Sequence, residues 1–108
     1  MSMYVELLSA VLADEDANPV TAGSALDVAI ECRSRMLRSK VQATVSAQHQ
    51  LAYEIAYDRA LVNLCALNGI DVDPERFAHP REERERLERA LAETGVDLSA
   101  AGHSRRHS

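Results

Sequence analysis

The sequence predicts an all-α fold, a small helical bundle built on one long central helix that two short helices flank. Apolar residues recur at helical spacing near both ends of the chain, and the 45 residues between Gly23 and Gly69 contain neither Gly nor Pro. No segment shows the clear alternation of a strand. A chain of 108 residues has the usual size of one domain. We therefore expect a single helical domain over residues 1–96 and a flexible tail over residues 97–108.

The first short helix is expected over residues 3–13. Leu8 and Leu12 recur on one helix face, as a helix that packs on a core requires. Acidic residues at 14–16 would oppose the dipole at the end of this helix, and Pro19 interrupts the chain. The helix should therefore end before this acidic stretch.

The long segment between the two glycines carries signals for a helix start and a helix end. Ser24 or Thr21 can cap the first turn. At the other end Asn68 precedes Gly69, which can adopt the left-handed conformation that closes many helices. Both ends of the central helix are thus defined by the sequence.

The length of this segment leaves two alternatives open. One helix of 45 residues would extend about 65 Å, whereas a compact domain of about 100 residues has a radius of gyration of about 13 Å. Either the segment breaks into two helices around Arg38–Val41, near residue 39, or a second subunit covers the part that overhangs.

The apolar pattern of the segment favours the second subunit. A seam with a period near 3.5 is formed by Ile30, Leu37, Thr44 and Leu51 at one heptad position and by Val41, Gln48, Ile55 and Val62 at its partner. A second apolar stripe lies on another side of the helix, so two faces need cover. We therefore predict a homodimer in which the long helices pack together, with Gln48 and Thr44 fixing the register.

The third helix is expected from Pro80 to Thr94. Leu87 and Leu91 form its apolar stripe, and oppositely charged residues four apart support it. Gly95 can close the helix, and residues 74–78 before it can form one turn that starts at a proline.

Composition excludes several classes of protein. The net charge of −5 argues against general nucleic-acid binding, although Arg33–Lys40 holds four cations and could contact a phosphate or an acidic partner.

Neither a signal peptide nor a membrane span is recognisable, so we expect a cytoplasmic protein. Cys32 and Cys65 should be free, buried thiols, and the histidines at 49, 79, 103 and 107 have no zinc-ligand spacing.

Two carboxylate pairs could bind a divalent cation such as Mg²⁺. Asp27 and Glu31, like Glu54 and Asp58, are four residues apart and share a helix face. On one unbroken helix the two pairs would point in roughly opposite directions. Only a break near residue 39 or a facing subunit would bring the four together, and otherwise they are solvated or paired charges.

These pairs resemble the acidic motifs of the all-α nucleoside triphosphate pyrophosphohydrolases of the MazG kind, which bind magnesium on neighbouring helices. The resemblance implies a small metal-dependent nucleotide pyrophosphohydrolase with Mg²⁺ at Asp27, Glu31, Glu54 and Asp58. In that family the acidic residues of a motif are three apart, whereas both pairs here are four apart.

A binding pocket is most plausible around Tyr53 and Tyr57, which lie one helical turn apart. Arg59 and Gln48 are close in sequence and complete the candidate binding residues. The alternative is that both tyrosines are core or interface residues whose hydroxyls reach the rim.

Because the sequence contains neither a nucleophile elbow nor a phosphate-binding glycine loop, the leading interpretation is a non-enzymatic protein. We expect a self-associating helical module with an interaction or regulatory role and without a cofactor. The alternative is the metal-dependent hydrolase that uses the four carboxylates.

Overall fold

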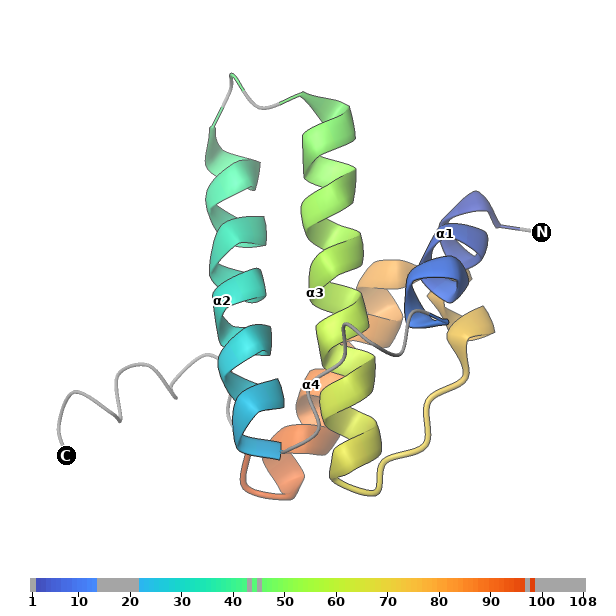
Figure 1. The fold of residues 1–108 in the computed structure, drawn as a ribbon, viewed down its shortest axis with the longest axis vertical. Helices are drawn as coiled ribbons and strands as arrows, with labels where there is room; N and C mark the ends of the chain where they lie inside the picture. Colours follow the sequence, from blue (N-terminus) through green and yellow to red (C-terminus); the bar gives the residue numbers. More distant parts are fainter. Residues whose placement is uncertain (1, 14–21, 43, 45, 97, 99–108) are drawn as a thin grey trace, which may run out of the picture.

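A computed structural model describes residues 2–13, 22–42, 44, 46–96 and 98 of the chain (Figure 1). Its elements are α1 (Met3–Leu12), α2 (Ala22–Val41), α3 (Ala47–Leu67), the 3₁₀ helix η2 (Pro74–Ala78) and α4 (Pro80–Glu93). The described residues include no strand, so the all-α prediction is confirmed. The expected acidic end of the first helix and, apart from Leu98, the expected C-terminal tail lie outside the described residues.

The central segment takes the broken alternative: two helices form instead of one. The break follows Val41, so the predicted position around Arg38–Val41 is wrong, because these residues still belong to α2. α2 ends at Val41, α3 begins at Ala47, and the two helices run antiparallel as a hairpin (Figure 1). Ser46 caps α3, because its hydroxyl accepts a hydrogen bond from the amide of His49 at 3.2 Å. The radius of gyration is 13.6 Å, as a compact domain requires. Since the segment does not form one 45-residue helix, its length no longer argues for a dimer.

The predicted ends of the second and third segments are confirmed. Gly69 has a φ of 76°, and the amide of Ile70 donates to the carbonyl of Cys65 at 2.8 Å. The same arrangement closes α4, where the amide of Val96 donates to the carbonyl of Leu91 and Gly95 has a φ of 97°. Both glycines therefore act as helix terminators.

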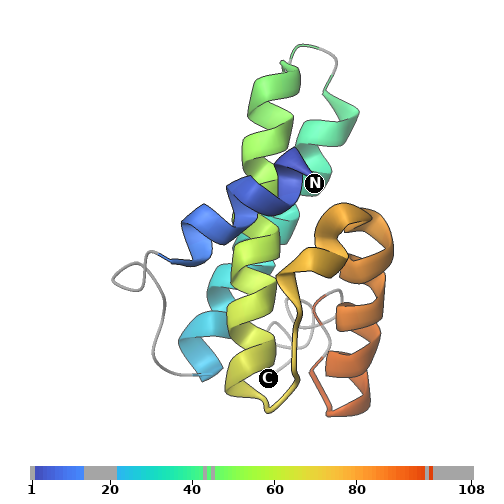
Figure 2. The same ribbon diagram turned by 90° about the vertical axis from the view of Figure 1, so that its right-hand side faces the viewer.

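The core lies between the helices that cover the hairpin and the part of the hairpin that is far from the α2–α3 turn. α1 crosses α3 on one side and α4 packs on α3 on another, while η2 lies between α1 and α4 and contacts both (Figure 2). The largest fully buried apolar side chains come from α1, α3, η2 and α4: Leu8, Tyr57, Leu61, Leu64, Phe77, Leu87 and Leu91. Leu98, which follows α4, is buried on the same core.

The hairpin divides into a covered and an uncovered part. The part we call the outer half consists of the described residues among 37–56, and its end at the α2–α3 turn extends beyond α1 and α4 (Figures 1 and 2). Ser39 is the only described residue of the outer half that is buried. Val41, by contrast, exposes 83% of its surface. The outer half therefore lacks an apolar core of its own.

In the part of the chain that is described, no helix combines the length and the apolar character needed to cross a bilayer.

Candidate functional site

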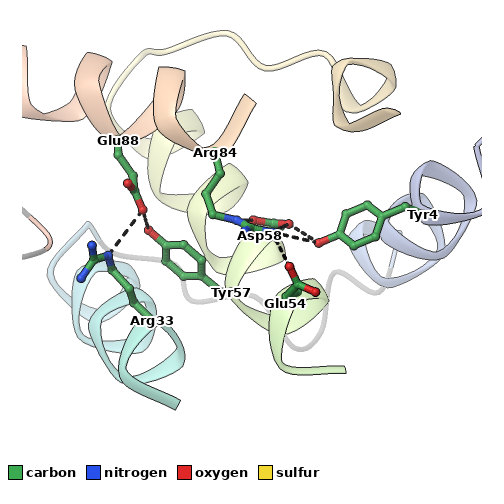
Figure 3. Close-up of polar contacts among 7 residues, drawn as sticks. All are labelled: Tyr4, Arg33, Glu54, Tyr57, Asp58, Arg84 and Glu88. Carbon is green, nitrogen blue, oxygen red and sulfur yellow. Dashed lines mark hydrogen bonds and ion pairs between the residues drawn. The ribbon is translucent and has the colours of Figure 1, made fainter. Parts of the chain in front are cut away.

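Charged and phenolic side chains from four helices meet inside the molecule (Figure 3). We call this group the polar network. Its members are Tyr4 of α1, Arg33 of α2, Glu54, Tyr57 and Asp58 of α3, and Arg84 and Glu88 of α4. They form two branches, one around Asp58 and one around Glu88.

Asp58 is the centre of the first branch. Arg84 donates to both of its carboxylate oxygens, from Nε and from Nη2, with both distances 2.8 Å. The Tyr4 hydroxyl donates to the same carboxylate, and Glu54 lies 3.5 Å from Nη2 of Arg84. Asp58 is fully buried and the Arg84 side chain exposes 7% of its surface. This is a two-bond fork shielded from water, the strongest geometry for such a pair.

The electrostatics of this branch follow from its burial. Burial raises the pKa of the Asp58 carboxyl, and the hydrogen bonds and charge of Arg84 oppose that rise. For Arg84, burial acts to lower the pKa, but the bonds to Asp58 raise it above its ordinary value. Burial and the neighbouring carboxylate also raise the pKa of Tyr4, which stays a hydrogen-bond donor. The protonation state of each of these three groups is therefore determined by burial together with its hydrogen-bond partners.

The second branch links α3 to α4 and α2. The hydroxyl of the fully buried Tyr57 donates to Glu88, which also accepts from Nε of Arg33 at 3.4 Å. Burial is the main cause that raises the pKa of Tyr57, and the bond to Glu88 adds to it. Glu88 thus holds two other helices to α4.

The two branches fasten the covered part of the fold. Among the described residues, every buried side-chain nitrogen and oxygen has a hydrogen-bond partner. Breaking a buried ion pair by removing one partner costs about 3–5 kcal/mol. We therefore interpret the polar network as a clamp between helices.

The four carboxylates of the predicted metal site are divided between two environments. Glu31 pairs with Arg35 at 3.1 Å, and Asp27 is exposed on α2. Glu54 and Asp58 do lie together, but Arg84 occupies the space between them. No three His, Cys, Asp or Glu side chains of the described residues are grouped as metal ligands. This arrangement does not fit a magnesium site, which needs several oxygen ligands around one ion.

The predicted binding residues also separate. Tyr53 lines a hollow between α2 and α3, which we call the hairpin pocket, while Tyr57 is buried in the polar network. Gln48 is exposed in the first turn of α3, and Arg59 is partly buried on the same helix. Tyr57 thus follows the alternative interpretation as a core residue, whereas Tyr53 keeps access to solvent.

The cations of the basic stretch Arg33–Lys40 on α2 line two different hollows. Arg35 and Arg38 line the hairpin pocket, together with Ser39, Gln42 and Tyr53. Arg33 and Lys40 line a cleft between α2 and α4, whose other residues are Met36, Leu37, Arg81, Arg84, Glu85 and Glu88. Because these cations point to different sides of α2, they do not form one continuous basic face.

Sequence reasoning missed three members of the polar network: Tyr4, Arg84 and Glu88. Arg84 lies in a run of charges that is typical of a solvated face. A signal was nevertheless present, because Arg84, Leu87 and Leu91 are spaced i, i+3 and i+7 and so share the buried face of α4.

Comparison of the chain with protein-family models, with curated proteins and with solved structures found no match.

Proposed function

We propose that the protein is a non-enzymatic helical interaction module that self-associates through the outer half of the α2–α3 hairpin. The observation that carries this proposal is the composition of that half. Among its described residues only Ser39 is buried, although Leu37, Val41, Leu51 and Ile55 are apolar.

Two helices alone cannot enclose a core. In the covered part of the molecule, α1, η2 and α4 supply the additional layers that bury the hairpin. α4 reaches only the inner edge of the outer half, where Leu37 lines a cleft with it and Glu54 pairs with Arg84. The apolar side chains of the outer half therefore remain in contact with water. A second copy would supply two more helices, and four helices are sufficient for a bundle core. Burying apolar surface between two copies would contribute about 25 cal/mol per Å² to the free energy of association.

The exposed side chains fit this arrangement. Leu37 and Val41 are one turn apart on α2, and they expose 42% and 83% of their surface. On α3, Leu51 and Ile55 are also one turn apart and only partly buried. All four belong to the predicted seam, which the break after Val41 divides into one pair on α2 and one pair on α3. A twofold dimer can use the same patch on both copies, so this surface suffices for a closed pair.

Two further features support an interaction module in the cytoplasm. The buried Asp58, Arg84 and Tyr57 are engaged with one another or with Glu88, which favours a structural role over acid–base chemistry. Cys32 and Cys65 are both free thiols, as is usual for proteins in a reducing compartment.

The experiment compares solution mass by size exclusion with multi-angle light scattering. The double variant Leu37→Lys with Val41→Lys places two cations on the patch, near the helix C-terminus where cations are tolerated. Leu67→Lys is the matched control, because Leu67 exposes 40% of its surface at the opposite end of the hairpin.

We expect twice the mass of one chain for the wild type and for Leu67→Lys, and one chain mass for the double variant. All three should have the same helical circular dichroism. A wild-type protein that stays monomeric at tens of micromolar would overturn the proposal, as would a double variant that still dimerises.

A further inference from the structure

The hairpin pocket is a hollow between α2 and α3 that is lined mainly by polar side chains. It has a volume of about 290 Å³ and is lined by Arg35, Arg38, Ser39, Gln42 and Tyr53. This volume is near the lower end of the range for small-molecule sites. We propose that the hairpin pocket binds the phosphate group of a small phosphorylated molecule.

The polar ends of the lining residues are mainly hydrogen-bond donors. Arg38 is an exposed residue and makes no ion pair within the described part of the chain. Arg35 uses Nε to pair with Glu31 at 3.1 Å, which leaves its terminal nitrogens. Gln42 adds an amide. None of the five lining residues carries a carboxylate that would repel an anion. Two guanidinium groups match the oxygens of a phosphate well, because each can donate two parallel bonds.

Ser39 and Tyr53 shape the pocket. The Ser39 hydroxyl already donates to the carbonyl of Met36 at 2.7 Å, so this buried residue serves as a wall. Tyr53 is partly buried and comes from the opposite helix. Its hydroxyl can donate to a phosphate oxygen, and its ring offers an apolar surface to the organic part of a ligand.

Charge makes this pocket a better anion site than the α2–α4 cleft. That cleft also contains Glu85 and Glu88, and its Arg33 and Arg84 are already paired with carboxylates. In the hairpin pocket, both lining cations are arginines on exposed positions. The chain as a whole has a net charge of −5. The local positive field of the two arginines therefore attracts an anion to the hairpin pocket.

The pocket adjoins the proposed dimer surface. Arg38 and Val41 are three residues apart on α2, so they are neighbours on the helix surface. The two proposals are nevertheless tested by different measurements, because solution mass reports self-association and calorimetry reports ligand binding.

The test is isothermal titration calorimetry of the wild-type protein with inorganic phosphate and with adenosine monophosphate, at constant ionic strength. Arg38→Gln removes one pocket cation. Arg81→Gln is the matched control, because Arg81 is an exposed arginine of α4 outside the pocket and its loss changes the net charge equally.

We expect Arg38→Gln to weaken binding about tenfold or more, the usual effect of losing a charge-assisted hydrogen bond, and Arg81→Gln to leave it unchanged. Tyr53→Phe should weaken phosphate binding less than Arg38→Gln does. Tighter binding of the nucleotide than of phosphate would support the proposal and identify stacking on Tyr53, while equal binding would support recognition of the phosphate alone. Absence of binding at millimolar ligand, or equal losses in Arg38→Gln and Arg81→Gln, would overturn it.

Discussion

Arg84 holds both carboxylate oxygens of Asp58 at 2.8 Å, and this fork joins α4 to α3 inside the molecule. Both side chains are almost completely shielded from water. The hydroxyl of Tyr4 adds α1 to the same carboxylate. One buried ion pair therefore fixes three helices that are far apart in the sequence, and the stability of the fold should depend on it.

Asp58→Asn should destabilise the protein by about 3–5 kcal/mol, because it leaves the Arg84 guanidinium buried without its counter-charge. The measurement is urea unfolding followed by circular dichroism. Glu85→Gln is the control, since Glu85 is an exposed carboxylate on the same helix as Arg84, and it should change stability by less than about 0.5 kcal/mol.

The double variant Asp58→Leu with Arg84→Met separates the two causes of this loss. Replacing both partners by apolar side chains removes the unpaired charge, so most of the stability should return. A double variant that is as unstable as Asp58→Asn would show that the loss does not come from the unpaired charge of Arg84.

Alkaline pH should destabilise the protein through its buried tyrosines. The pKa of Tyr57 is raised above its ordinary value of 10.0, chiefly by burial, as is that of Tyr4. The unfolded chain therefore loses these protons first, and the stability that each phenol contributes is present below pH 10 and lost as pH rises above it.

The contribution of the Tyr57 hydroxyl to stability is measured as the difference in unfolding free energy between the wild type and Tyr57→Phe. It should be largest between pH 7 and pH 9 and should shrink above pH 10, when measured by urea unfolding at each pH. Tyr53→Phe provides a matched substitution one turn away. A difference that stays constant or grows above pH 10 would be inconsistent with a buried, protonated Tyr57.

The two thiols should differ in reactivity. Cys65 is fully buried, and burial raises its pKa to about 12, whereas Cys32 is only partly buried. Because the thiolate is the reactive form, Ellman's reagent at pH 8 should modify Cys32 first and Cys65 only when the fold opens. Cys32→Ser should remove the fast phase, and Cys65→Ser should leave it. A fast phase that survives Cys32→Ser would contradict the burial of Cys65.

Gly69→Ala tests the left-handed helix end. Gly69 has a φ of 76° and space for an added methyl group, so the cost, about 1 kcal/mol, should come from backbone strain alone. Gly23→Ala is the control: Gly23 lies within α2 and also has space for a methyl group, so alanine there should stabilise by up to about 1 kcal/mol. Equal effects of the two substitutions would contradict the assignment of Gly69 as a helix terminator.

Local signals in the sequence predicted the fold class and most helix ends. Gly69 and Gly95 close their helices as expected, and Pro80 begins α4. The break in the central segment was harder to place, since no glycine or proline marks it. Its local signal is Ser46, a capping residue that accepts from the amide of His49.

The candidate sites depended on tertiary contacts that spacing alone does not give. Asp58 was recognised as a special carboxylate, but its partner Arg84 is 26 residues away on another helix, in a run that resembles a solvated surface. Tyr53 was a candidate binding residue from the sequence and lines the hairpin pocket, whereas Arg35 and Arg38 were recognised only as part of a basic stretch. Which side of α2 each cation faces became clear only from the folded hairpin.

The most direct test of self-association through the hairpin is an isotope-filtered NMR experiment on a mixture of ¹³C-labelled and unlabelled chains, which detects contacts between copies. The account predicts intermolecular contacts to the methyl groups of Leu37 and Val41, and none to those of Leu67. Intermolecular contacts restricted to Leu67 would contradict self-association through the hairpin. The absence of any intermolecular contact at tens of micromolar protein would contradict it as well.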